Sequence, residues 1–441
     1  MVEPRKPQAT VGFVDEYCQT YQNLFSDVRN YEYFKFLHLG MISELPRKSL
    51  PEIARIAGLK DGQGLHHLLR DAMWDVKAFQ EMRLWLTRAT IGLRPITLCI
   101  DETGDEKKGL ATDYVAKQYI GNLGKVKNGI VSVNAYAVID NMTYPLMFKV
   151  FKPRTRLKSG EQYKTKPQLA IEIIQKIIKY GFNIELVLAD SLYGESTELI
   201  SVLVEIKLPF IVAIRSNHVV WSPQERVRYN RWFAYNQSLS HRPTETRYIR
   251  EIIFGKRREL RYFEITKDDT NPESADTWFI MTNLPGKIQQ TLGNLYSLRN
   301  WIEYSFKQVK NQLGWADFRL TDYNSIERWW EIVFSTYLLV SLQALQFKSS
   351  PVNSVTNTNL TEESDSTSIK EEFSQHLEWE QGTNWNALNN LRLIIQPLIF
   401  WCLIEPWLKV FQISGLRQKF LKLIEIMDSF QSSPIKYPAA I

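Results

Sequence analysis

The sequence predicts an α/β fold in which a mixed β-sheet carries the functional groups and helical regions lie toward both ends of the chain. Two short apolar runs, Pro95–Asp101 (PITLCID) and Ile184–Asp190 (IELVLAD), are bounded by turn signals, as buried strands are. Two longer runs, Ile130–Ile139 and Thr143–Val150, meet at an Asp-Asn turn and indicate a hairpin. A helix expected over Pro167–Tyr180 separates this hairpin from the second short strand.

The residues before the first strand are rich in helical patterns. Within them, Ser49–Asp75 is typical of a helix-turn-helix, with Ser49 at a cap position, Gly58 at the turn and a second helix over Asp61–Arg70. The same pattern is common in helical bundles that do not touch DNA. A DNA-reading element and a plain bundle therefore both remain open.

Aspartates end both short strands, and functional groups of such sheets gather just past the carboxyl ends of the strands. Asp101 is followed directly by Glu102, and successive strand residues point to opposite faces, so we expect only one of the two to face a metal ion. Alternatively, Asp101 caps a turn and Asp190 is the N-cap of a helix that begins near Gly194.

A third candidate element is Leu295–Gly314 (LYSLRNWIEYSFKQVKNQLG), which predicts one amphipathic helix. Its residues Tyr296, Arg299, Glu303 and Lys310 are spaced by three, four and seven positions, and at about 100° per residue they fall within roughly 60° of one another. Such a helix holds a carboxylate, a phenol and two cations at the edge of a core. Taken alone, the pattern also fits a solvated face.

Together these segments resemble a DDE transposase of a bacterial insertion sequence, from the branch with a Tyr-Arg-Glu-Lys signature. The four residues of the last helix match that signature at every spacing. Ile100–Gly109 (IDETGDEKKG) is similar to the first-aspartate region of the insertion sequence 701 family, and Leu188–Gly194 (LADSLYG) resembles its second-aspartate region. The resemblance runs from about residue 20 to residue 345 and extends to insertion sequence 4 type transposases.

The resemblance implies a ribonuclease H-like catalytic core with a β-rich insertion, plus helical N-terminal and C-terminal regions. We accordingly expect a helical DNA-binding domain at 12–94, the first part of the core at 95–215, the insertion at 216–290, the completing catalytic helix region at 291–347, a flexible linker at 349–378 and a C-terminal helical segment at 383–430. The linker is predicted from its Ser, Thr, Asn and Glu content. The last segment is a packing or dimerisation element.

By resemblance, three acids are catalytic and metal-binding: Asp101, Asp190 and Glu303. Asp101 is chosen over Glu102 because Asp-x-Thr is the family form. They would hold two Mg²⁺ (or Mn²⁺) ions for in-line displacement at phosphorus. DNA hydrolysis would free the element end, and transesterification would join its 3′-OH to target DNA, which is cut-and-paste transposition.

DNA phosphates are expected at two groups of residues. By resemblance, Tyr296, Arg299 and Lys310 would bind them near the cleaved end. The segment Lys149–Lys166 has a net charge of +6 and includes Arg154, Arg156 and Lys158, although a solvated basic loop would look the same. In the insertion, Trp221, Trp232 and Trp278 could stack a displaced base or belong to a core.

The implied partners are double-stranded DNA, as element end repeats and target, and a second copy in a homodimeric end complex. No membrane partner is expected, because the most apolar stretch, Leu391–Ile404, contains Arg392 and Pro397 and reads as a buried helix pair. Three scattered cysteines favour a reduced cytoplasm, and the resemblance implies that the cell is bacterial and that the protein is nucleoid-associated. The alternatives are a metal-dependent DNA nuclease, or a domesticated DNA-binding relative without strand transfer.

Overall fold

The computed structural model describes residues 5–219, 226–239, 242–256, 259–272, 276–349, 383–410, 415–429 and 437. The chain divides into two compact units. Ile91–Phe306 form the unit that contains the sheet, and Met1–Thr90 with Lys307–Ile441 form a helical unit. The N-terminal helices therefore share a unit with the C-terminal helices, an association that sequence patterns do not reveal.

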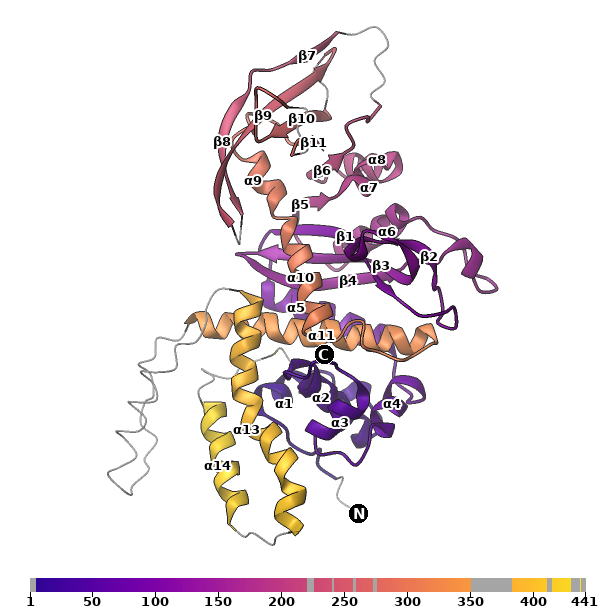
Figure 1. Ribbon diagram of the computed structural model, residues 1–441, viewed down its shortest axis with the longest axis vertical. Helices are drawn as coiled ribbons and strands as arrows, with labels where there is room; N and C mark the ends of the chain where they lie inside the picture. The colour runs from indigo at the N-terminus through magenta and orange to yellow at the C-terminus, as the bar shows by residue number, and fades with distance from the viewer. Residues whose placement is uncertain are drawn as a thin grey trace, which may run out of the picture. The chain divides into compact units, whose positions relative to one another are not determined.

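The described strands form one 11-stranded sheet in the order β2-β3-β1-β5-β6-β11-β10-β9-β7, with β4 also paired to β3 and β8 to β9 (Figure 1). The strands are β1 (Ile96–Glu106), β2 (Ala116–Ile120), β3 (Lys125–Ile139), β4 (Met142–Val150), β5 (Ile184–Ala189), β6 (Phe210–Ile214), β7 (Val227–Tyr229), β8 (Phe233–Leu239), β9 (Arg242–Phe254), β10 (Arg261–Thr266) and β11 (Trp278–Thr282).

The half of the sheet that carries the candidate acids is built from β4, β3, β1, β5 and β6. β3 is antiparallel to β4 and β1, whereas β5 is parallel to β1 and β6. The hairpin turn between β3 and β4 has positive φ at Asp140 (49°) and Asn141 (63°), as a two-residue type I′ turn requires. The expected strand end at Asp101 is wrong, because β1 continues to Glu106 in register with β3.

Helices connect these strands. α6 (Lys166–Lys179) begins with a capping box between Thr165 and Gln168 and packs against β3 and β4 (Figure 1). The short α7 (Ser191–Gly194) and α8 (Thr197–Glu205) follow β5 and return the chain to β6. This antiparallel hairpin, crossover helix and parallel strand reproduce the order expected from the sequence.

The strands β7 to β11 extend the same sheet, because β11 pairs with β6. Two tryptophans in this part are covered by guanidinium groups: Arg250 lies 4.2 Å from the ring centroid of Trp232, and Arg247 lies 4.2 Å from that of Trp278. Trp221 lies outside the described residues. An arginine therefore already stacks on each described tryptophan of the predicted base-stacking set.

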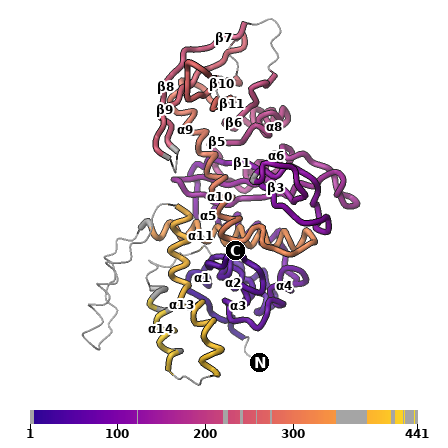
Figure 2. The backbone as a smooth tube through the Cα atoms, viewed as in Figure 1, coloured from indigo at the N-terminus to yellow at the C-terminus, as the bar shows by residue number. Residues whose placement is uncertain are grey.

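The prediction of one helix over Leu295–Gly314 is wrong. The chain passes from α9 (Leu292–Ser297), which lies beside β8, into α10 (Asn300–Asn311), as Figure 2 shows. At the junction, Arg299 N donates to Tyr296 O and Ile302 N donates to Arg299 O, each at 3.0 Å. These three-residue hydrogen bonds are of the tighter 3₁₀ type, so the α-helical angles between signature residues do not hold across the junction.

The helical unit contains α1 (Gly12–Gln19), α2 (Val28–Ile42), α3 (Leu50–Ile56), α4 (Gln63–Arg70), α5 (Val76–Ile91, whose last residue belongs to the sheet unit), α11 (Tyr323–Ser349), α13 (Asn384–Val410) and α14 (Leu416–Ser429). Short 3₁₀ turns lie at Gln22–Leu24, Gly121–Leu123 and Arg154–Arg156. α11 is buried over most of its length, and Trp330 stacks on Trp315 at 4.5 Å between ring centroids. It therefore forms the centre of the unit.

The expected helix-turn-helix corresponds to α3 and α4. Gly58 has φ of +69° in the turn between them, where a glycine is strongly favoured. Ser49 occupies the N-cap position of α3, but its side chain makes no capping hydrogen bond. The turn is therefore as predicted and the cap is not.

The C-terminal segment differs from its prediction. α13 runs unbroken through Pro397, so the expected helix pair over Leu391–Ile404 is wrong. By length and composition alone, the helix Asn384–Val410 is long and apolar enough to cross a membrane, although several residues of its first half, including Leu391, are buried against protein. Residues 350–378 of the predicted linker lie outside the described part of the chain.

Candidate active site

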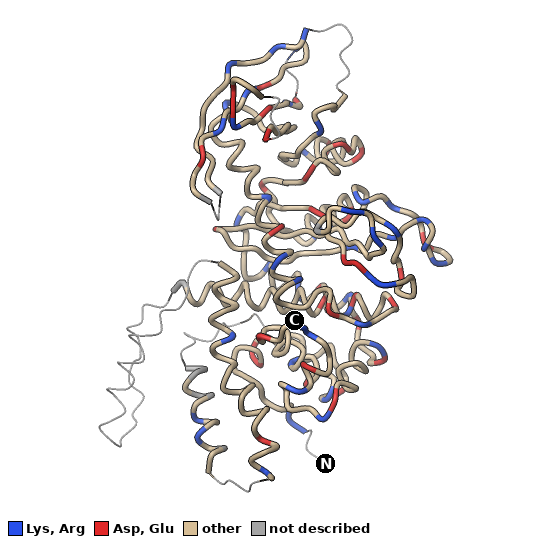
Figure 3. The backbone as a smooth tube through the Cα atoms, in the orientation of Figure 1, with Lys and Arg blue, Asp and Glu red and all other residues tan. Residues whose placement is uncertain are grey.

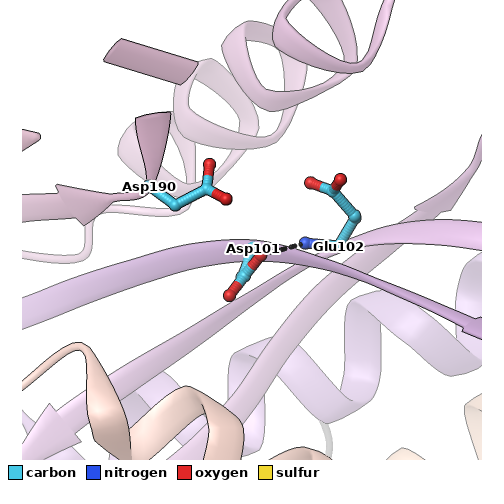
Figure 4. A group of neighbouring side chains, drawn as sticks. All are labelled: Asp101, Glu102 and Asp190. Carbon is cyan, nitrogen blue, oxygen red and sulfur yellow. Dashed lines mark hydrogen bonds between the residues drawn. The ribbon is translucent and has the colours of Figure 1, made fainter. Parts of the chain in front are cut away.

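Three carboxylates meet where β1 lies beside the end of β5. Asp101, Glu102 and Asp190 each offer an oxygen that lies within 4.8 Å of the others (Figure 4). The pairing explains the meeting: Ile100 lies opposite Ala189 in the parallel ladder, so the residues that follow each of them are adjacent. Sequence patterns placed both aspartates at this sheet position, and the structure adds Glu102.

The two acids that β1 contributes to the cluster, Asp101 and Glu102, have different surroundings. In Figure 4, the carboxylates of Glu102 and Asp190 lie on the same side of β1, whereas that of Asp101 leans to the other side. One oxygen of Asp101, Oδ1, accepts a 2.7 Å hydrogen bond from the Glu102 N–H. Strand alternation thus holds for the side-chain directions, yet both acids contribute an oxygen to the cluster.

Asp190 is both an N-cap and a member of the cluster. Its side chain accepts a 2.9 Å hydrogen bond from Leu192 N at the start of α7. Burial and the negative charge of Glu102 raise the pKa of Asp190 above its ordinary value. Burial, with the charges of Asp190 and Glu102, also raises the pKa of Asp101, against the opposing effect of Arg299. Such a site favours a cation that offsets the repulsion.

Arg299 supplies positive charge at this position. Its Nη1 donates to Asp101 Oδ2 and its Nη2 donates to Glu303 Oε1, both at 2.8 Å. Tyr296 lies next to this guanidinium, and burial raises the pKa of its hydroxyl to about 12. Arg299 is therefore bound to two of the predicted ligands.

Among the described residues, Glu303 is linked to the cluster through Arg299. Its side chain is 50% exposed, and it is not among the acids whose oxygens lie within 4.8 Å of one another. Lys310, the last member of the signature, lies in the last turn of α10, beyond Phe306, where the chain enters the helical unit.

Several side chains of the predicted basic segment, residues 149–166, interact with other residues of the sheet unit. Several Lys and Arg residues colour it in Figure 3. Lys158 pairs with Asp113 at 2.6 Å, and Arg156 donates to backbone oxygens of Leu110 and Thr112. Arg154 is exposed and lies over the ring of Tyr163 at 4.4 Å. Much of the segment's charge is therefore offset by neighbouring groups.

Some residues around the cluster were not predicted. Lys166 Nζ pairs with Glu102 at 2.9 Å. Asn134 lies opposite Asp101 on β3, and its buried Oδ1 has no hydrogen-bond partner in the described structure. Asn134 could have been found in the sequence as a polar residue inside the apolar strand run Ile130–Ile139. The buried Glu102 Oε2 likewise makes no hydrogen bond of ordinary geometry in the described structure, although the Tyr193 hydroxyl lies near it. Carboxylate and amide oxygens of this kind suit a hard divalent cation.

Comparison with known proteins decides the family. The family model described as DDE superfamily endonuclease matches residues 21–248. A probable transposase for insertion sequence element IS701 from Microchaete diplosiphon is 54% identical over 329 residues, covering 74% of this chain and 87% of that protein. The chain belongs to the IS701-type DDE transposases. This transposase is thus an enzyme that acts on DNA, and its sheet unit contains a ribonuclease H-like core.

Membership carries two further consequences. DDE enzymes use divalent metal ions, and the acidic cluster offers the oxygen donors for them. A transposase acts on DNA, so this chain binds DNA.

Proposed function

We propose that this transposase excises its element by cut-and-paste and joins the freed 3′-OH to target DNA. The observation that carries the proposal is the convergence of acids from three elements: Asp101 of β1 and Asp190 after β5 lie in one cluster, and Glu303 of α10 is connected to Asp101 by Arg299. Two aspartates in one cluster, with a third acid held next to them by Arg299, suit a reaction in which metal ions must contact both the attacking and the leaving oxygen.

In this proposal Asp101, Asp190 and Glu303 hold two Mg²⁺ or Mn²⁺ ions. When bound, the ions activate the attacking oxygen and stabilise the leaving oxygen at phosphorus. Because Glu303 is half exposed and bound to Arg299, its carboxylate must turn from the guanidinium to join the aspartates. Repositioning of Arg299 is therefore part of assembling the site.

Arg299, Tyr296 and Lys310 bind phosphates near the cleaved end. A guanidinium that leaves Asp101 for a phosphate exchanges one anionic partner for another and can contact two oxygens at once. Arg154, Arg156 and Lys158 extend this contact along the duplex. Of these, exposed Arg154 is the best placed, because no ion pair to it occurs among the described residues.

The remaining regions bind and pair the DNA ends. Residues 12–94 bind the end repeats, with α4 as the reading helix of the helix-turn-helix. A homodimer holds two ends, since each end requires its own catalytic site. The enzyme acts at the nucleoid of a bacterial cell.

The test uses purified full-length protein, Mg²⁺ or Mn²⁺, a labelled donor carrying the sequences that flank the gene, and a supercoiled target plasmid. We expect released donor ends that become joined to the plasmid, and no product with Asp190→Ala. Metal-dependent cutting without joining would replace the proposal with a nuclease function. Binding without cutting would leave only a DNA-binding protein.

A further inference from the structure

We propose that Glu102 is a metal-binding carboxylate of this transposase, acting with Asp190 and with one oxygen of Asp101. The inference rests on the proposed function, because it concerns the same metal site. It differs in its ligands: the family form Asp-x-Thr assigns Asp101 alone on β1, whereas the structure brings the acids of both adjacent positions to the cluster.

The directions of the side chains support Glu102 as a ligand. Glu102 and Asp190 present their carboxylates on the same side of β1, and Asp101 leans away toward Arg299 (Figure 4). A cation between β1 and β5 on that side meets Glu102 and Asp190 first. The Asp101 oxygen that accepts from the Glu102 N–H is the one turned back toward the cluster, while its other oxygen is held by Arg299.

Two buried polar groups at the cluster, on Glu102 and Tyr193, also support a bound cation. Glu102 Oε2 and the Tyr193 hydroxyl are buried neighbours, and neither makes a hydrogen bond of ordinary geometry among the described residues. Tyr193 is fully buried within the short helix α7. A buried carboxylate oxygen with only a weak contact to a phenol is costly in free energy, and a bound cation removes that cost.

The positive charges next to the cluster also support a role for Glu102. Lys166, the first residue of α6, pairs with Glu102 at 2.9 Å, and both side chains are largely buried. Arg299 pairs with Asp101 in the same way. Asp101 and Glu102 therefore each have a cationic partner, which offsets part of the repulsion between two adjacent carboxylates close to a third. Lys166 and a metal ion compete for the same carboxylate.

The experiment measures Mn²⁺ binding to the full-length protein without DNA, by the decrease of the free Mn²⁺ electron paramagnetic resonance signal. Glu102→Gln keeps the side-chain shape and removes the charge, so Mn²⁺ affinity should fall by about tenfold or more. Glu106→Gln is the matched control, since Glu106 lies on the same strand, is exposed, and pairs only loosely with Lys127 at 3.7 Å. Its Mn²⁺ affinity should equal that of the wild type.

The Mn²⁺ affinity of Lys166→Met is a second measurement. It should change if Glu102 binds the metal ion, and it should not change if Glu102 only supports the fold. Removing the competing ammonium should tighten Mn²⁺ binding by roughly fivefold, while Lys166→Met combined with Glu102→Gln should lose that gain. Melting temperatures of all variants establish that the fold is retained. Unchanged Mn²⁺ affinity in Glu102→Gln, with a clear loss in Asp190→Asn, would overturn the role of Glu102 and leave the metal site standing. Unchanged affinity in both would overturn the metal site itself.

Discussion

Arg299 and Asp101 are 198 residues apart in sequence and form a 2.8 Å ion pair, in which the guanidinium Nη1 donates to the Asp101 Oδ2. The same guanidinium holds Glu303 on its other side. Two expected metal ligands are thus paired with a residue expected to bind DNA. When Arg299 binds a DNA phosphate, it must release the carboxylates of Asp101 and Glu303, because one guanidinium cannot pair with all three anions at once.

Replacement of Arg299 tests this link. Arg299→Ala should slow end cleavage by about 10²-fold and make the salt dependence of end binding shallower by about 0.9 in slope, as loss of one phosphate contact does. Arg299→Lys should recover the slope more than the rate, because an ammonium cannot contact two oxygens as a fork. Filter binding over a salt series and gel-based cleavage measure the two quantities.

The control for this comparison is Lys179→Ala. Lys179 is exposed in the last turn of α6, outside the segments proposed to bind DNA, and its loss should leave slope and rate unchanged. An unchanged slope in Arg299→Ala would exclude a phosphate contact, and Arg299 would then serve only the carboxylates.

Glu303→Gln should abolish cleavage and preserve end binding. The amide keeps the shape but loses a ligand charge, and a cost of ~4 kcal/mol in transition-state stabilisation corresponds to about 10³-fold in rate. Because Glu303 is half exposed, its replacement should not disturb folding. Cleavage and electrophoretic mobility assays on the same DNA separate the two effects. Cleavage at the wild-type rate would remove Glu303 from the catalytic set.

The strands that sequence patterns located best are those whose ends coincide with turn signals. β5 (Ile184–Ala189) and β4 (Met142–Val150) lie within one or two residues of their predictions. β1 was predicted to end at Asp101 because the following residues are polar. It continues because β3 pairs with it as far as Glu106, and such pairing depends on a partner that is distant in sequence.

The apolar runs before Asp101 and Asp190 indicated that the two aspartates lie close together, but they did not indicate that Glu102 joins them or which residues pair with the three acids. Alternation correctly predicted opposite directions for Asp101 and Glu102, yet one Asp101 oxygen still turns toward the Glu102 amide. The spacing of Tyr296 and Arg299 suggested one α-helix. The 3₁₀ junction between them could not be predicted, because the same residues favour α-helical and 3₁₀ backbone alike. Contacts across the fold decide these details.

Two residues of the basic segment should contribute unequally to DNA binding. Arg154 is exposed over Tyr163, while Lys158 is neutralised by Asp113 at 2.6 Å. Arg154→Ala should lower the salt slope by about 0.9, and Lys158→Ala should lower it by less, because part of its charge is already offset. Fluorescence anisotropy with labelled duplex over a salt series gives both slopes. Equal slopes for the two variants would contradict the role of the Asp113 pair.

The ion pair between Arg83 and Glu331 is an internal anchor of the helical unit. Its atoms lie 2.9 Å apart, and neither side chain is more than 1% exposed. Arg83→Met should cost about 3–5 kcal/mol, because it leaves a buried carboxylate unpaired, and adding Glu331→Leu should recover much of that loss. Arg55→Met, at an exposed pair with Glu52, should cost at most about 1 kcal/mol. Denaturant unfolding measures all four proteins, and a double variant no better than Arg83→Met would contradict the expectation.

His38 should make the stability of the helical unit depend on pH. Its ring is buried between the Phe34 carbonyl, to which Nδ1 donates, and the Ser335 hydroxyl, both at 2.9 Å. Burial lowers the pKa of His38 from 6.5 to about 4, so below pH 6.5 the unfolded chain binds a proton that the folded chain does not. The stabilisation from neutral His38 is complete above pH 6.5 and is lost progressively as the pH falls toward 4, by up to ~3 kcal/mol.

The comparison that isolates this effect is His38→Gln, which keeps a polar side chain but cannot titrate. Carboxylates also titrate in this range, and because they are common to both proteins their contribution cancels in the difference. Between pH 7.5 and about pH 5 the wild type should lose about 2 kcal/mol more unfolding free energy than the variant does. Thermal unfolding followed by circular dichroism at several pH values measures the difference. Parallel pH profiles would mean that the imidazole reaches solvent and takes up its proton in the folded state.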